Sequence, residues 1–80
     1  MQSQITRKLL DPLSLKWAYG LSDDELASHL GLHIRAVQYW AAGKRSPSTQ
    51  VKMLAAYVHK EFEQNNISPV NPSALTFEAQ

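Results

Sequence analysis

From Ser22 onward the chain reads SDDELASHLGLHIRAVQYWAAG, and this stretch of sequence decides the fold. Ser22 and Glu25 have the spacing of a capping box, in which a hydroxyl and a carboxylate each accept a backbone N–H at the start of a helix. Apolar residues then recur at helical spacing as far as Gly31, a residue type that readily takes the left-handed conformation ending a helix. A second run with helical spacing follows almost at once. The stretch therefore predicts two short helices, over 22–30 and 34–42, joined by a tight turn.

The side chains around this turn indicate how the two helices meet. Ala27 is small enough to let the second helix cross the first closely, and Gly31 permits a steep angle between them. Val37 and Trp40 are placed to pack back on the first helix, next to Leu26. Two helices that meet in this way form a helix-turn-helix, so the sequence predicts this unit at the centre of the chain.

Helical spacing extends on both sides of this unit. The segment before it contains Asp11-Pro12, which gives either a short helix over 4–10 followed by one over 12–19, or one kinked helix. A further helix is expected over 48–64. Because no segment alternates between apolar and polar residues, we expect an all-α fold, a bundle of four to five helices. Trp17 is expected in the core, and along the helix over 48–64 the apolar residues that recur at helical spacing are Val51, Leu54, Ala55, Val58 and Phe62.

After residue 66 the sequence no longer has the apolar spacing of a helix. Residues 67–80 contain two prolines and have neither a helix cap nor a periodic apolar face. Eighty residues are enough for one domain only. We therefore expect one helical domain over 1–66 and an extended or disordered tail over 67–80, in which Leu75 and Phe77 are available for a docking contact.

The net charge of +1 conceals an uneven distribution of charge. The stretch from His33 to Lys60 contains no Asp or Glu, whereas the seven acids lie outside it, at positions 11, 23–25, 61, 63 and 78. A basic region of this kind is what the phosphates of nucleic acid select. Its basic residues are Arg35, Lys44, Arg45, Lys52 and Lys60.

Several classes of protein are excluded by what the sequence does not contain. Without cysteine there is no disulfide, no thiolate nucleophile and no cysteine-type zinc site, and no apolar run has the length of a membrane span. Glu25, His29 and His33 are spaced by four, but Gly31 ends the helix between the two histidines, so we expect no metal site. No phosphate-binding glycine loop or nucleophile elbow is found, so we expect no enzyme, no cofactor and no small-molecule substrate.

The central unit also resembles a known family. The residues that carry the resemblance lie around the turn and are LASHLGL at 26–32, Val37, and WAAGKRSPS at 40–48. They are similar to the phage-repressor and Cro-like helix-turn-helix family. The resemblance covers about residues 12–64 and implies a lambda-repressor-like fold in a dimeric bacterial or phage regulator. Residues 35–40, followed by Gly43-Lys44, are also similar to small phage regulators encoded beside anti-CRISPR genes.

The helix over 34–42 is the candidate for reading DNA. Val37, Trp40 and Ala41 are expected to face the core, which leaves toward solvent Ile34, Arg35, Gln38, Tyr39 and Ala42. In the major groove an Arg forks onto guanine, a Gln onto adenine, and an apolar side chain can pack on a thymine methyl. Tyr39 can reach a base or a phosphate. The alternative for Arg35 and Gln38 is a solvated helix face, and for Tyr39 a place at the edge of the core.

The resemblance implies base reading by Ile34, Arg35 and Tyr39, and phosphate contacts by Lys44 and Arg45. His33 and Ser22 are further candidates for phosphate contacts, since each directly precedes a helix. The acids at 23–25 would repel a DNA backbone that came near them. Either the Ser22 hydroxyl and nearby backbone N–H groups make the contact, or this helix lies farther from the duplex.

We therefore expect a sequence-specific regulator of transcription, a homodimeric repressor on palindromic or repeated sites in double-stranded DNA, located in the cytoplasm with the nucleoid of a bacterial host. An alternative is an interaction module that uses the same fold to bind and inhibit a protein such as RNA polymerase. The dimer contact is expected on the exposed side of helix 48–64, at Met53, Tyr57 and Phe62, or in the tail.

Overall fold

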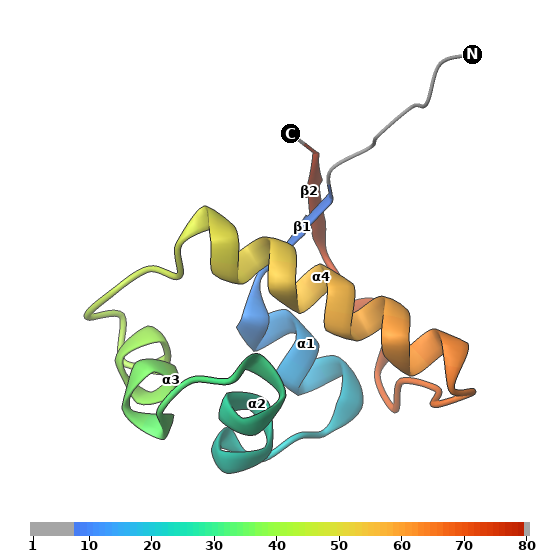
Figure 1. The fold of residues 1–80 in the computed structure, drawn as a ribbon, viewed down its shortest axis with the longest axis horizontal. Coiled ribbons are helices and arrows are strands. Elements are labelled where there is room, and N and C mark those ends of the chain that lie inside the picture. Colours follow the sequence, from blue (N-terminus) through green and yellow to red (C-terminus); the bar gives the residue numbers. More distant parts are fainter. Residues whose placement is uncertain (1–7, 80) are drawn as a thin grey trace.

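Four helices share one core, and a short two-stranded sheet joins the two ends of the described chain (Figure 1). The computed structural model describes residues 8–79. The helices are α1 (Pro12–Tyr19), α2 (Asp23–Leu30), α3 (Ile34–Ala41) and α4 (Thr49–Gln64). The other elements are β1 (Lys8–Leu10), a 3₁₀ turn η1 (Pro72–Ala74) and β2 (Phe77–Ala79). Among residues 8–79, no helix combines the length and the apolar character needed to cross a bilayer.

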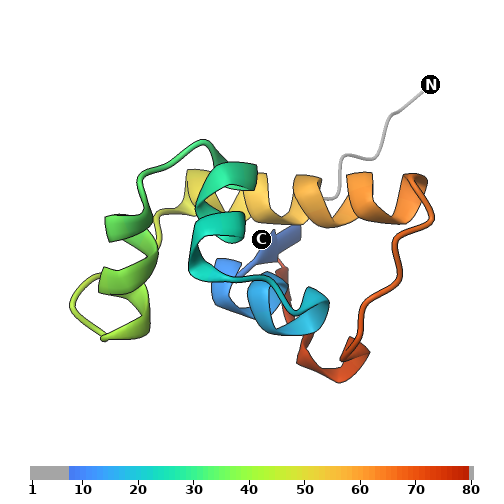
Figure 2. The ribbon, with the colours of Figure 1, turned by 90° about the horizontal axis from the view of Figure 1, so that it is seen from below.

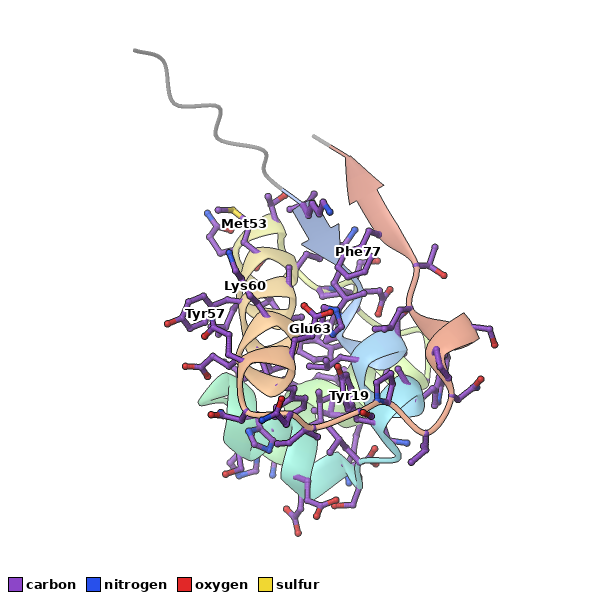
Figure 3. The ribbon with its side chains drawn as sticks, turned by 90° about the vertical axis from the view of Figure 1, so that its right-hand side faces the viewer. Tyr19, Met53, Tyr57, Lys60, Glu63 and Phe77 are labelled. Carbon is purple, nitrogen blue, oxygen red and sulfur yellow. The ribbon has the colours of Figure 1, made fainter. Side chains whose placement is uncertain are left out.

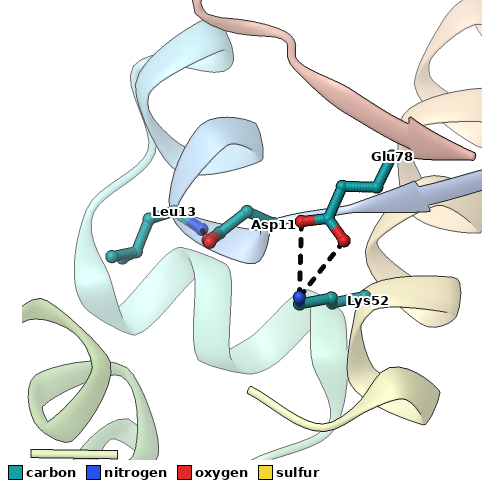
Figure 4. A network of polar contacts seen from close by, with 4 residues as sticks. All are labelled: Asp11, Leu13, Lys52 and Glu78. Atoms are coloured by element: carbon teal, nitrogen blue, oxygen red, sulfur yellow. Dashed lines mark hydrogen bonds and ion pairs between the residues drawn. The ribbon is translucent and has the colours of Figure 1, made fainter. Parts of the chain in front are cut away.

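The helices begin where the capping residues predict. Asp11 accepts the N–H of Leu13 at 2.8 Å at the start of α1 (Figure 4). At the start of α2 the Ser22 hydroxyl accepts the N–H of Glu25 at 3.1 Å, and the Glu25 carboxylate accepts the N–H of Ser22 at 2.8 Å. Both halves of the predicted capping box are therefore present. Ser48 caps α4 in the same manner, accepting a backbone N–H at 3.2 Å.

The turn between α2 and α3 follows from one residue. Gly31 has a φ of +68°, a left-handed conformation that a residue with a Cβ rarely adopts, and its N–H bonds to carbonyls of the last turn of α2. The chain thereby reverses within three residues, and α3 begins at Ile34. The predicted pair of short helices around this glycine is confirmed.

The core lies between α4 and the three short helices. Leu26 of α2 and Val37 of α3 are fully buried, as predicted, and α4 contributes its inner side chains. In Figure 1 α3 lies below and to the left of the N-terminal end of α4, and in Figure 2 it lies to the left of the same end. The buried residues of the core are Leu10, Leu15, Ala18, Tyr19, Leu26, Ala27, Leu30, Val37, Trp40, Ala55, Val58 and Phe62.

The prediction of a helix over 4–10 is wrong for the part that is described. Lys8–Leu10 is a strand, and residues 4–7 lie outside the described residues. Proline restricts the residue before it to extended backbone, and Asp11 has φ −61° and ψ 127°, so no helix can run through Asp11 into α1. The strand nevertheless buries Leu9 and Leu10.

The segment 67–79 is extended in part, as expected, but it also carries structure. Strand β2 pairs antiparallel with β1, with Leu9 opposite Glu78 and Leu10 opposite Phe77. The Phe77 ring lies 5.4 Å from that of His59 on α4, and Glu78 pairs with Lys52 (Figure 4). The chain is therefore not all-α, because its last residues complete a small sheet beside α4.

Two further predictions of burial, those of Trp17 and Ala41, are wrong. Trp17 is 56% exposed, because α1 buries the stripe that contains Leu15 and Ala18 and Trp17 falls on the opposite side. Ala41, at the end of α3, is exposed. Leu54 is also exposed, because α4 turns inward the side that contains Ala55 and Val58.

Candidate nucleic-acid interface

The start of α3 is fixed by His33. Its Nδ1 accepts the backbone N–H of Arg35 at 3.1 Å, so His33 is the cap of this helix. In a neutral imidazole whose Nδ1 accepts, the proton is carried by Nε2. Since the His33 side chain is exposed, its Nε2–H is available to an acceptor on an approaching molecule.

The outer side of α3 carries most of the residues that the sequence predicts to contact DNA bases. Arg35 and Gln38 are exposed, and because they are three residues apart they lie on the same side of the helix. Tyr39 is half-buried, so one part of its ring remains accessible. Ile34 is also half-buried and packs against the core, which corrects the expectation that it faces solvent. Arg35, Gln38 and part of Tyr39 thus form one continuous polar surface.

The loop after α3 folds back on the same surface. The N–H groups of Lys44 and Arg45 donate to the carbonyl of Tyr39 at 2.9 and 3.4 Å, and Gly43 between the helix and these residues has a φ of +74°. The guanidinium of Arg45 lies over the Tyr39 ring at 5.4 Å from its centre. Although ten residues separate them in the sequence, Arg35 and Arg45 therefore border one region.

This region is hollowed. The hollow has a volume of about 350 Å³, and its lining combines apolar residues with the two arginines and two serines. It joins the turn before α3, the outer side of α3 and the start of α4. The lining residues are Leu32, Arg35, Ala36, Tyr39, Trp40, Arg45, Ser46, Ser48 and Val51.

The charges of this region are not neutralised within residues 8–79. No carboxylate of the described chain lies within ion-pair distance of Arg35, Lys44 or Arg45. Lys52 differs, because its Nζ lies 3.3 Å from the Glu78 carboxylate of β2 (Figure 4). The basic stretch of the sequence thus contributes three cations, Arg35, Lys44 and Arg45, to the surface around α3. Lys52 instead forms an ion pair with Glu78 of the tail.

Ser22 and the acids beside it are engaged locally. The Ser22 hydroxyl accepts the N–H of Glu25, and its own O–H remains available because the residue is exposed. The Asp23 carboxylate lies 3.6 Å from the ammonium of Lys16. Asp24 is exposed and forms no ion pair with the described residues. Negative charge at this turn is therefore reduced but not removed.

The candidate dimer residues divide into two groups. Met53 and Tyr57 are exposed on the outer side of α4, where Figure 3 shows them pointing away from Tyr19 and Phe77. Phe62 was wrongly assigned to this surface, since it is only 8% exposed. Its ring packs edge-on against Tyr19 at 4.7 Å, which places it on the inner side of α4.

One polar cluster has no counterpart in the sequence-based predictions. The hydroxyl of Tyr19 and Nδ1 of His59 share a hydrogen bond of 2.8 Å, and Nε2 of His59 lies 3.6 Å from the Glu63 carboxylate. Burial raises the pKa of Tyr19, and the negative charge of Glu63 raises it further. Tyr19 therefore stays protonated at neutral pH. With the His59 proton on Nε2, the nitrogen that lies beside Glu63, Nδ1 accepts from the Tyr19 hydroxyl. Since forty residues separate the two, no local spacing could have indicated the pair.

Within residues 8–79, no group of three or more histidine, aspartate or glutamate side chains is arranged to hold a metal ion. Comparisons of the chain with protein-family models, with curated proteins and with solved structures find no match.

Proposed function

We propose that this protein is a sequence-specific regulator that binds double-stranded DNA and represses transcription. In this proposal α2 and α3 form a helix-turn-helix, and α3 enters the major groove. The observation that carries the proposal is the exposure of Arg35 and Gln38 on one side of a short helix, with two more unneutralised cations, Lys44 and Arg45, on the loop beside it. Arg and Gln are the side chains that read guanine and adenine by paired hydrogen bonds.

The role proposed for each residue follows from its position on α3 or on the loop after α3. Arg35 and Gln38 contact base edges, and Ile34 and Tyr39 supply apolar contacts at the margins of the reading surface. Lys44 and Arg45, on the loop that folds back on α3, contact phosphates and fix the position of the protein on the duplex. The Nε2–H of His33 and the O–H of Ser22 are further phosphate donors.

We further propose that two copies act together in the cytoplasm, on the nucleoid of a bacterial host. A helix of eight residues covers only a few base pairs, whereas two copies of α3 in successive major grooves, about 34 Å apart, would read two half-sites. Repression follows from covering a promoter.

Selection of bound DNA from a random pool tests the proposal. We expect the selected sequences to share a motif with two half-sites, either palindromic or repeated, at a spacing of 10 to 11 base pairs or so. The selection is performed at physiological salt, because lower salt favours non-specific binding through phosphates. A pool that shows no enrichment of any motif would contradict the proposal.

One observation favours the alternative of a protein-binding module. Trp17 on α1 is 56% exposed, and an exposed tryptophan is a frequent anchor of protein interfaces. If the protein acts in this way, Trp17→Ala abolishes its effect on the partner, for example inhibition of RNA polymerase. If it acts through DNA, Trp17→Ala leaves the selected motif unchanged.

A further inference from the structure

The outer side of α4 carries an apolar stripe that the chain itself leaves exposed. Tyr57 is 59% exposed, and Met53 and Leu54 are exposed beside it. At helical periodicity Met53 and Tyr57 are neighbours on one side of the helix. We call these three residues the α4 stripe. Polar residues border the stripe, with Gln50 toward the N-terminal end of α4 and Lys60 and Glu61 toward its C-terminal end.

We infer that the α4 stripe binds the same stripe of a second copy, with the two α4 helices antiparallel. In one register Met53 and Leu54 lie opposite the partner's Tyr57, while Glu61 lies opposite the partner's Gln50. All three stripe residues are then covered at the centre, and the amide of the partner's Gln50 can donate to the Glu61 carboxylate at the rim. A two-fold axis repeats each contact once.

Charge favours the antiparallel arrangement. The C-terminal half of α4 carries Glu61 and Glu63 against one base, Lys60. The N-terminal end has the positive end of the helix dipole and is preceded by Lys44 and Arg45. Antiparallel helices bring the acidic end of one copy beside the basic end of the other, whereas parallel helices would bring the two acidic ends together.

The position of α3 is compatible with a two-fold axis that relates two antiparallel α4 helices. In Figure 1 α2 and α3 lie below α4, and Figure 3 shows Met53 and Tyr57 on the side of α4 that faces the viewer of Figure 1. A two-fold axis in front of α4, parallel to the plane of Figure 1 and perpendicular to the oblique α4, turns the second copy end for end but leaves its α3 on the same side of the paired helices. Both copies of α3 therefore reach the same side of the dimer.

The register also sets how far apart the two ends of the helix pair lie. With 1.5 Å per residue, it places the N-terminal ends of the two α4 helices roughly 20 Å apart along their axes. Each α3 lies below the N-terminal end of its own α4 (Figure 1). The two copies of α3 therefore lie near opposite ends of the helix pair, where each can approach its own half-site. The approach to half-sites rests on the proposed function, but the interface itself does not.

The surface area that the two stripes can bury limits the affinity of the dimer. A standard interface buries about 800 Å² on each partner, and one helix face with three apolar residues is smaller than that. We therefore expect the dimer to be in equilibrium with monomer at micromolar concentrations, and DNA with two half-sites to complete its assembly.

Sedimentation of the full chain without DNA tests the interface separately from DNA binding. We expect a concentration-dependent dimer, and for Tyr57→Asp at least a tenfold rise in the dissociation constant. Val70→Asp is the matched control, because Val70 is 75% exposed and lies outside the stripe, and it leaves the constant unchanged. Circular dichroism verifies that both variants are folded. A chain that is monomeric at millimolar concentration, or a Tyr57→Asp variant that dimerises like the wild type, overturns the inference.

Disulfide trapping tests the register. The chain has no cysteine, so single cysteines report on chosen pairs. An equal mixture of Met53→Cys and Tyr57→Cys is expected to form the mixed disulfide faster than Met53→Cys forms a disulfide with itself, and Val70→Cys stays monomeric. Parallel helices would reverse the order of the first two rates. If the stripe dimerises as stated but selection finds no DNA motif, the proposed function fails and the interface stands.

Discussion

The guanidinium carbon of Arg45 lies 5.4 Å from the centre of the Tyr39 ring, so a side chain of the loop after α3 is held against the outer side of α3. The backbone supports the same arrangement, because the N–H of Lys44 donates to the Tyr39 carbonyl at 2.9 Å. Tyr39 is therefore both a candidate contact to DNA and the support of Arg45, a candidate contact to phosphate.

Replacing Tyr39 separates these two roles. Tyr39→Phe keeps the ring on which Arg45 rests, whereas Tyr39→Leu removes it. A partly exposed cation–π contact contributes about 0.5–1 kcal/mol, so we expect Tyr39→Leu to bind DNA roughly two- to fivefold more weakly than Tyr39→Phe. Since phosphate contact is the role proposed for Arg45, the loss is expected to be equal on selected and random DNA, as measured by fluorescence anisotropy. Equal affinities of the two variants would show that the ring does not hold Arg45.

The sheet formed by the two ends of the described chain should contribute to stability chiefly through Phe77. Its ring packs on His59 and is only partly exposed, so Phe77→Ala is expected to lower the free energy of unfolding by about 1–2 kcal/mol, less than for a fully buried phenylalanine. The ion pair between Glu78 and Lys52 is near the surface, and Glu78→Gln should cost no more than about 1 kcal/mol. Urea unfolding measures both. A larger effect of Glu78→Gln would contradict this ranking.

Tyr19 should make the stability depend on alkaline pH. Its pKa in the folded chain is raised above the value of about 10 found in unfolded chains, so the folded state holds this proton more tightly. The stabilisation is fully present below pH 10 and is lost as the pH rises through the folded pKa, because the unfolded state releases the proton first. We expect the free energy of unfolding to fall more steeply above pH 10 for the wild type than for Tyr19→Phe.

The same variant has an effect at neutral pH. Tyr19→Phe removes the hydroxyl that donates to His59, which leaves a buried ring nitrogen without that partner. An unsatisfied buried group of this kind costs about 1–3 kcal/mol. Parallel pH profiles of the two proteins above pH 10 would contradict the assignment of the alkaline transition to Tyr19.

How far the sequence predicts this molecule depends on the range of the interactions. The ends of α2 and the turn at Gly31 are set by contacts over three or four residues, so capping and spacing were sufficient to predict them. The pairing of β1 with β2 joins residues about seventy positions apart, and neither three-residue strand has a pattern long enough to reveal it. For the same reason the sequence could not indicate that Glu78 engages Lys52.

The exposure of Trp17 illustrates a second limit. A large aromatic residue is usually buried in a small domain, but the helix α1 has one inner stripe, and Leu15 and Ala18 occupy it. The residue type favoured a buried position for Trp17, whereas the helical periodicity of α1 placed it on the exposed side. At the candidate site the exposed positions of Arg35 and Gln38 followed from the burial of Val37 and Trp40, whereas the approach of Arg45 to Tyr39 depended on the path of a loop.

The central claim is that Arg35 on α3 contacts bases and so recognises the DNA sequence, while Lys44 contacts the phosphate backbone of the DNA. The most direct measurement compares the affinity for the selected site with that for random DNA, at several salt concentrations, for the wild type, Arg35→Ala and Lys44→Ala. We expect Arg35→Ala to lose about 1–3 kcal/mol on the selected site and most of its preference over random DNA. Lys44→Ala should weaken both alike and reduce the salt slope by about one. If Arg35→Ala loses equally on both DNAs, or leaves the preference intact, α3 does not read the sequence through Arg35.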